Sequence, residues 1–204
     1  MSELSEELRE KVFGQSLSDG TVAKTTRILV AADRLLRTNP SATLEDIGVE
    51  AGVSRTTVYR RFPTRQLLIL TLSRWAVGRI AEALERASIE VAPAYVALYQ
   101  ATRNVIGVKV SLDYTRGLAL PDDPIVSEYQ EQMTHTAIRL VRQCQSEGII
   151  SNDVDPGWVR VLFYAIIHAA TGFDSLDAET VDEDTLTRRI VDSLLHGVGT
   201  GRTL

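Results

Sequence analysis

A run of hydroxyl and guanidinium side chains between Arg55 and Arg61 has the chemistry to bind nucleic acid. Arginine can make two parallel hydrogen bonds to a guanine edge or to a phosphate, and threonine can donate to a phosphate or contact a thymine methyl. Tyr59 can reach a phosphate with its hydroxyl. A charged, solvated surface helix would look similar, so the prediction of DNA binding depends on how neighbouring residues position this run.

The residues before this run predict a short helix followed by a tight turn. Thr43 can accept a hydrogen bond from a backbone N–H near Asp46, which starts a helix whose apolar residues recur at helical spacing. Gly52 supplies the positive φ that a sharp stop requires, and Ser54 can cap a second helix that ends at about Phe62. The turn is about three residues long, as in a helix-turn-helix.

The second helix, expected over residues 55–62, has two unlike sides. Val58 and Phe62 lie four residues apart and share an apolar side, while charged and hydroxyl residues occupy the rest of the cylinder. Such a helix can pack by one side and contact DNA with the other. The conjunction of cap, glycine turn, apolar spacing and basic helix in one short segment favours a DNA-reading motif over a merely solvated helix.

The helices on either side are expected to support the motif. A periodic helix over residues 22–37 carries an apolar stripe, and Asn39-Pro40 breaks the chain after it. We expect a three-helix core made by Ile28, Ala31, Ala32, Leu35, Leu36, Leu44, Ile47, Val58 and Phe62. Because a core of about fifty residues is marginal alone, the next helix, starting after Pro63 and reaching about residue 88, is expected to support it and to join it to the rest of the chain.

The segment from about Thr26 to Leu68, with RILVAADRLL, TLEDIGVEAGVSRTTVYRRF and PTRQLL, closely resembles the DNA-binding domain of TetR-family transcriptional regulators. The AGVS turn followed two residues later by TVYRRF is the most specific part. Gly48 stands where the family usually has Ala, at a cost of about 1 kcal/mol of helix propensity. Thr56 replaces a common Gly, and Arg65-Gln66 a common Lys-Glu, so Arg65 keeps the positive charge that the family places against a phosphate.

The resemblance implies an all-α protein that binds a roughly palindromic operator as a homodimer, most often as a repressor that a small molecule releases. With Arg65 included by resemblance, the predicted DNA-contacting residues are Thr43, Ser54, Arg55, Thr56, Thr57, Tyr59, Arg60, Arg61 and Arg65. The expected organisation is an N-terminal extension over residues 1–20, a helix-turn-helix domain over 21–66, and a helical effector-binding and dimerisation domain over 67–204.

The remainder of the chain reads as helices separated by breakers, with no alternating β pattern of convincing length. The expected helices span residues 94–107, 109–118, 123–147, 156–173 and 182–197. Near the N-terminus, the spacing of Leu4, Leu8 and Val12 permits a short helix, although a frayed chain end is the alternative. The predicted fold class is all-α.

From Trp158 to Ala170 the chain is apolar nearly all round apart from Arg160 and His168, yet it is too short to span a membrane. We therefore expect protein to bury it on several sides. The last helix carries its apolar residues, Leu194 among them, on one face. With the same pair of helices from a second copy, residues of about 156–197 could form a four-helix bundle, which is how TetR-family regulators usually dimerise.

The 204-residue chain is 44% hydrophobic and 24% charged, as in an ordinary globular protein. Its net charge of −5 is unevenly distributed, with −3 on residues 1–20, +5 on residues 21–74 and −7 on residues 75–204. An acidic remainder would discourage contact with DNA through the wrong surface. The single cysteine, Cys144, excludes an internal disulfide, and no export signal or membrane span is evident, so the predicted location is the cytoplasm.

The candidate effector-binding residues are Tyr95, Tyr99, Tyr114, Met133, Tyr164 and His168. Each also fits ordinary core packing, and for His168 a hydrogen-bonded core position is favoured by roughly two to one. The histidines lack metal-ligand spacing, no serine lies in a nucleophile elbow, and no catalytic carboxylate pair stands out. No metal, cofactor or enzymatic activity is therefore predicted.

The leading hypothesis is a ligand-responsive, DNA-binding repressor. An activator or a ligand-independent regulator would carry the same helix-turn-helix. The alternative from another class is an all-α small-molecule-binding or catalytic protein in which the helix-turn-helix is only structural. The exposed basic side of the helix over residues 55–62 discriminates between these classes, because a structural motif would not need it.

Overall fold

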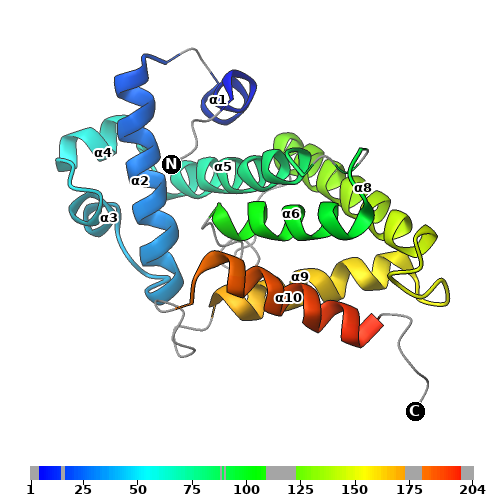
Figure 1. Cartoon of the computed structure of the whole chain (residues 1–204). Coiled ribbons are helices and arrows are strands. Elements are labelled where there is room, and N and C mark those ends of the chain that lie inside the picture. The colour runs from blue at the N-terminus through cyan, green and yellow to red at the C-terminus, as the bar shows by residue number, and fades with distance from the viewer. Residues whose placement is uncertain are drawn as a thin grey trace. The chain divides into compact units, whose positions relative to one another are not determined.

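The computed structural model describes residues 5–14, 17–87, 89, 91–108, 123–172 and 181–198. The regular elements in these segments are the α-helices α1 Glu6–Phe13, α2 Asp19–Thr38, α3 Leu44–Glu50, α4 Arg55–Arg61, α5 Arg65–Glu85, α6 Ala94–Gly107, α8 Pro124–Ser146, α9 Pro156–Gly172 and α10 Glu183–Val198 (Figure 1). The all-α class is confirmed, and α6, α8, α9 and α10 begin and end within one residue of the predicted positions. The helix predicted over residues 109–118 lies outside the described residues.

The chain divides into two compact units. The first comprises residues 1–79 with 110–129, and the second comprises residues 80–109 with 130–204. The dividing points fall inside α5 and inside α8, so both helices carry residues of both units. This division by packing does not test the functional boundary expected between residues 66 and 67, which stays a prediction.

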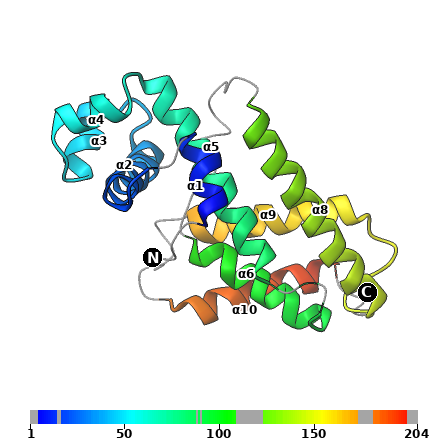
Figure 2. The same cartoon turned by 90° about the horizontal axis from the view of Figure 1, so that it is seen from above.

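In the first unit, α2, α3 and α4 pack together, as the two views show (Figures 1 and 2). The side chains that fill this three-helix core are Ile28, Leu29, Ala32, Leu36, Ile47, Val58 and Phe62. Gly48 permits close packing here, because a Cβ at this position would lie 2.9 Å from Cγ2 of Val58. The predicted core is confirmed except for Leu35, which is only half-buried. The close approach of α3 to α4 accounts for the poor helix propensity of Gly48.

The short helix α1 packs onto the same unit through Leu8 and Val12, whose side chains are almost fully buried. Ser5 caps its start by accepting from the backbone N–H of Leu8 at 3.1 Å, and Gly14 ends it with φ of 67°. Leu8 lies over Gly78 of α5, where a Cβ would collide with the leucine Cδ1. The short N-terminal helix is therefore confirmed, and a frayed end is wrong for this segment.

Lys11 fixes α1 to the start of α8 within the first unit. Its Nζ lies 2.9 Å from the carboxylate of Glu7 and 3.0 Å from that of Glu128, and 5.3 Å from the centroid of the Tyr129 ring. The hydrogen bond to Glu7, followed by that to Glu128, raises the pKa of Lys11. Together with the contact at Gly78, these contacts attach α1 to the parts of α5 and α8 that belong to the first unit.

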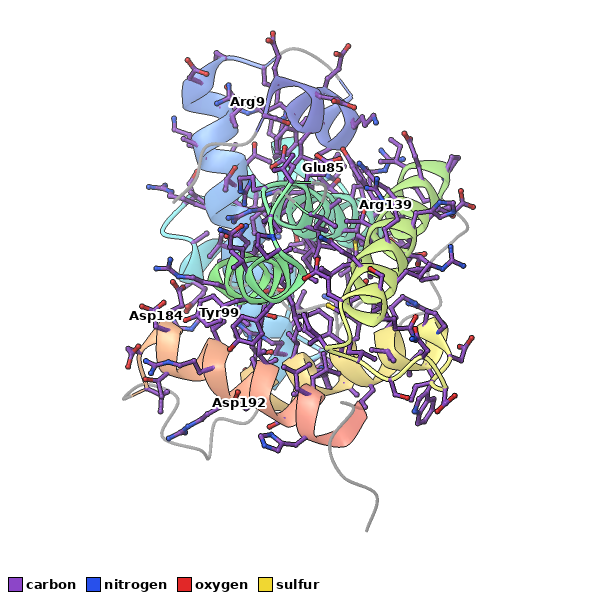
Figure 3. The ribbon with its side chains drawn as sticks, turned by 45° about the vertical axis from the view of Figure 1, so that its right-hand side comes forward. Arg9, Glu85, Tyr99, Arg139, Asp184 and Asp192 are labelled. Atoms are coloured by element: carbon purple, nitrogen blue, oxygen red, sulfur yellow. The ribbon has the colours of Figure 1, made fainter. Side chains whose placement is uncertain are left out.

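In the second unit, α10 packs against both α6 and α9. Figure 3 shows Tyr99 of α6 beside the start of α10, where its hydroxyl donates to the carbonyl oxygen of Asp184 at 3.4 Å. Just after α8, the carboxylate of Glu147 caps α6 by accepting from the backbone N–H of Ala94 at 3.0 and 3.1 Å. Leu194 of α10 is buried within this unit. It is therefore covered within one chain, which corrects the expectation that Leu194 belongs to the dimer interface.

Protein covers α9 less than the sequence predicts. Val159 and Phe163 are buried, whereas Trp158 is 59% exposed and Val161 is 47% exposed. His168 is exposed as well, so its predicted core position is wrong. One side of α9 packs inside the unit, and its other side leaves apolar surface uncovered in the single chain.

Cys144 is fully buried in the second unit, and desolvation raises the pKa of its thiol to about 12. Burial and the raised pKa make this thiol unreactive. Across the described segments, no helix combines the length and apolarity needed to cross a membrane. The same segments contain no group of three or more His, Cys, Asp or Glu side chains that could hold a metal ion.

We expect Gly78→Ala and Gly20→Ala to differ, although both replace a helical glycine. Alanine raises helix propensity by up to about 1 kcal/mol, and Gly20 has open space around it. At Gly78 the new methyl would collide with Leu8 and press on the ring of Tyr129. Urea denaturation should show Gly20→Ala to be neutral or stabilising and Gly78→Ala to be destabilising by about 1–3 kcal/mol, with faster tryptic cleavage at Arg9. Equal stabilities of the two variants would mean that α1 is not seated on α5.

Candidate nucleic-acid interface

A complete capping box starts α3. The Thr43 hydroxyl oxygen accepts from the backbone N–H of Asp46 at 3.2 Å, while the Asp46 carboxylate accepts from the Thr43 backbone N–H at 2.9 Å and from its hydroxyl at 2.8 Å. These bonds, the one from the Thr43 backbone above all, lower the pKa of the Asp46 carboxyl. The predicted cap is confirmed, and a contact of Thr43 with DNA stays a prediction.

The turn between α3 and α4 is tight and closed by hydrogen bonds. The backbone N–H of Gly52 donates to the carbonyl oxygen of Val49 at 3.0 Å, and Gly52 has φ of 62°, where a side chain would be strained. The hydroxyl oxygen of Ser54 then accepts from the backbone N–H of Thr57 at 3.3 Å and starts α4. The predicted helix-turn-helix is therefore present.

One side of α4 is fixed by packing, and the other is open. Val58 is fully buried, and Phe62 at the end of the helix is buried with it. The exposed members of the predicted contact set are Thr43, Ser54, Arg55, Thr56 and Arg60. The half-buried members are Thr57, Tyr59, Arg61 and Arg65.

Glu45 of α3 contacts two residues of α4. Its Oε1 accepts from the hydroxyl of Tyr59 at 2.6 Å and lies 3.0 Å from Nη2 of Arg55, whose guanidinium carbon is 5.3 Å from the centroid of the Tyr59 ring. The hydrogen bond from Tyr59 lowers the pKa of the Glu45 carboxyl and raises the pKa of the phenol. Sequence reasoning missed Glu45. The available signal was the four-residue spacing of Arg55 and Tyr59, which puts both on one side of α4.

Two predicted DNA contacts have partners inside the protein. Arg61 lies beside Phe13, with 5.8 Å between its guanidinium carbon and the ring centroid, and burial lowers its pKa. Arg65 donates to the carbonyl oxygens of Ala42 and Pro40, both at 2.6 Å. This ties the start of α5 to the connection between α2 and α3. Each residue thus has a structural role that the sequence does not reveal, and its contact with DNA stays a prediction.

Comparison with known proteins agrees with this geometry. Residues 28–72 match the sequence model of the bacterial regulatory proteins of the tetR family. Over 190 residues the chain is 29% identical to the HTH-type transcriptional repressor LfrR of Mycolicibacterium smegmatis, covering 91% of this chain and 94% of LfrR. The family model and this relative together support a TetR-family transcriptional regulator. The resemblance indicated by the helix-turn-helix residues is thereby confirmed.

Solved structures of TetR-like regulators share the fold. The crystal structure of LfrR from Mycobacterium smegmatis in complex with proflavine matches with a TM-score of 0.63 at 24% identity, over 88% of this chain and 99% of that one. PfmR, a TetR-family regulator from Thermus thermophilus, matches with a TM-score of 0.68 at 17% identity, over 86% of this chain and 100% of that one. The TetR-family fold therefore extends along most of the chain, well beyond the helix-turn-helix.

The residues predicted to bind an effector lie in unlike surroundings. Tyr95 at the start of α6 is 44% exposed, and His168 of α9 is exposed as well. Met133 of α8 is buried. Tyr114 lies outside the described residues. The role of these four in ligand binding stays a prediction.

The other two candidates make contacts within the second unit. Tyr99 donates to the backbone at the start of α10, as described above. The ring of Tyr164 lies 5.5 Å from the guanidinium carbon of Arg160 and 6.2 Å from the ring of Phe163, measured to the centroids. Both tyrosines therefore contribute to packing, and their contact with a ligand also stays a prediction.

We expect Arg65→Ala to lower the free energy of unfolding by about 1–3 kcal/mol, because two charged hydrogen bonds to the backbone are lost. Lysine keeps the charge but not the planar fork that reaches two carbonyl oxygens. Arg65→Lys should therefore remain destabilised in thermal unfolding, yet recover most of the DNA affinity that Arg65→Ala loses in gel shifts at several salt concentrations. A lysine variant as stable as the parent protein would refute the positioning role of Arg65.

Proposed function

We propose that this regulator is a homodimeric repressor that holds a roughly palindromic operator through α4 and releases it when a small molecule binds its helical domain. The observation that supports DNA reading by α4 is the exposure of Arg55, Thr56 and Arg60 on a helix whose other side is locked by Val58. A helix that is fixed by one side and polar on the other suits the major groove.

Arg60 and Thr56 are the residues best placed to read bases. Both are exposed, and neither side chain hydrogen-bonds to another of the described residues. Arginine can bond to guanine with two hydrogen bonds, and threonine can contact a thymine methyl. Phosphate contacts around them would come from Thr43, Ser54, Thr57, Arg61 and Arg65. Arg55 and Tyr59, which contact Glu45, complete the predicted contact set.

The distribution of charge supports the same orientation. Residues 21–74 carry a net charge of +5, and residues 75–204 carry −7. The positive segment would be drawn toward DNA, and the negative segment would be repelled by it. Because the proposed partner is chromosomal DNA, we propose the cytoplasm as the compartment in which the regulator acts.

We propose α9 as the centre of the dimer interface. Trp158, Val161 and Ala165 are exposed at spacings of three and four residues, with His168 following three residues later. Such spacing places them along one side of the helix. Apolar surface of this kind is typically covered by a partner, and a second α9–α10 pair would complete a four-helix bundle. The two α4 helices would then enter major grooves about one DNA turn apart, roughly 34–36 Å or somewhat more.

A ligand can release DNA only if it binds better to one state of the dimer than to the other. The solved LfrR structure contains proflavine, and we propose that this chain likewise binds a small molecule in its helical domain. A ligand that favours a dimer with wrongly spaced α4 helices lowers operator affinity, and the operator lowers ligand affinity by the same factor. Trp158, which is 59% exposed, provides a fluorescence signal for screening such compounds.

Gel-shift titration with DNA from the flanks of the chain's own gene tests DNA binding. Arg60→Ala should weaken operator binding by about tenfold or more, because a bidentate arginine–guanine contact is lost. Arg34→Ala removes the same charge from the same unit at a residue 3.5 Å from Glu50, and it should have a far smaller effect. If the parent protein retards none of this DNA at low salt, the alternative of an all-α small-molecule-binding or catalytic protein with a structural helix-turn-helix is favoured.

Val161→Asp should convert the dimer to a monomer, because a carboxylate would be buried in an apolar interface. Val91→Asp makes the same change in the same unit at a residue that is 85% exposed and lies outside the helices, so it should leave the dimer intact. Sedimentation velocity measures the effect, and far-UV circular dichroism verifies that both variants fold. Charging Leu194 would instead disrupt the interior of one chain. A dimeric Val161→Asp variant would place the interface elsewhere.

A further inference from the structure

Glu45 places a negative charge within the surface that is proposed to bind DNA. Its Oε1 accepts the Tyr59 hydroxyl at 2.6 Å and lies 3.0 Å from Nη2 of Arg55. Both partners belong to the predicted DNA contact set. A carboxylate near a polyanion opposes binding through charge repulsion. Glu45 should therefore lower the affinity of this surface for DNA.

The contact changes what the two partners can offer to DNA. While Tyr59 donates its single hydroxyl proton to Glu45, it has none to donate to a phosphate. Arg55 has five N–H donors, so it can keep its bond to Glu45 and still present others to a guanine edge. The charges of Arg55 and Glu45 cancel, and this part of the surface therefore attracts phosphate less than the number of arginines suggests.

The three side chains are arranged at the surface and not in the core. The side chain of Arg55 is 73% exposed and that of Glu45 is 37% exposed. An ion pair this exposed contributes little to the stability of a protein. Its main effects are therefore the orientation of Arg55 and Tyr59 and the local electrostatic potential that DNA meets.

We propose that Glu45 is a specificity-determining residue, which holds Arg55 and Tyr59 in position for the operator and discourages binding to unrelated DNA. Unrelated DNA is bound mainly through phosphate contacts. There, the carboxylate of Glu45 offsets the positive charge of Arg55 and occupies the hydroxyl proton of Tyr59. On the operator, base contacts hold α4 in the groove while the three side chains remain together. The inference rests on the proposed function, because it requires α4 to bind DNA.

The test compares Glu45→Gln with Glu50→Gln on two duplexes of equal length. One duplex carries the sequence that the parent protein selects from a randomised pool, and the other carries the same bases in scrambled order. Glutamine at position 45 retains an oxygen that accepts from Tyr59 but removes the charge. Glu50 lies on the same helix and is 3.5 Å from Arg34 of α2, so Glu50→Gln removes an equal charge without altering a contact of α4.

Glu45→Gln should bind the scrambled duplex about three- to tenfold more tightly than the parent protein does. The plot of log affinity against log salt concentration should be steeper by about 0.9, which is the value for one added phosphate contact. Its affinity for the selected duplex should change less, so the ratio of the two affinities should fall. Glu50→Gln should keep the ratio and the salt slope of the parent protein. Fluorescence anisotropy at several salt concentrations measures the affinity and the salt slope of each protein on both duplexes.

Equal changes on both duplexes, or an unchanged salt slope, would overturn the inference and leave Glu45 as a structural link between α3 and α4. A Glu45→Gln variant that fails to fold, as judged by circular dichroism, would overturn it in the same way. If the parent protein selects no sequence and binds neither duplex at low salt, the proposed function fails first, and the inference fails with it.

Discussion

The surface proposed to bind DNA depends on the burial of one side of α4. Val58 is fully buried, and Gly48 lets α3 approach so closely that a Cβ there would lie 2.9 Å from the valine methyl. Burying a valine side chain contributes about 1.5–3 kcal/mol, which is enough to fix how a two-turn helix is rotated about its axis. Once one side is packed, helical geometry determines which residues point outward. The identity of the exposed residues, Thr56 and Arg60 among them, is therefore a consequence of the packing beneath them.

The arginines near α4 appear in the sequence as one basic group, but the structure uses them differently. Arg65 holds the backbone between α2 and α3, Arg61 covers an aromatic ring of α1, and Arg55 is 3.0 Å from Glu45. Arg60 remains exposed. Attraction to any DNA rises with free positive charge, whereas recognition of one sequence requires side chains held in place. The internal contacts of Arg55, Arg61 and Arg65 fix the positions of these side chains. Under the proposed function, they would also reduce general affinity for DNA.

Local rules determine the elements that the sequence predicts correctly. The cap at Thr43, the positive φ of Gly52 and the apolar spacing of α4 act over a few residues, so the helix-turn-helix could be recognised without a structure. The contacts of Glu45 and Arg65 could not, because their partners lie 14 and 23 residues away and meet only after the helices pack. The helix α1 was ambiguous for the same reason. Leu8 of α1 can pack against α5 only because α5 has a glycine, Gly78, opposite it.

The sequence of α9 predicts a helix that protein buries on several sides, but hydropathy does not identify the molecule that would cover it. Within one chain α9 packs on α6 and α10 and buries Val159 and Phe163, while Trp158 and Val161 stay exposed. The apolar side of α10 is already used inside the unit, as the burial of Leu194 shows. A partner would therefore have to approach α9 itself. Because α9 would then pack on its own unit by one side and on the partner by the other, a ligand that rearranges α6 or α10 would also change how the two chains are held together. In the proposed dimer, this would provide a direct physical route from a ligand site in the second unit to the spacing of the two chains.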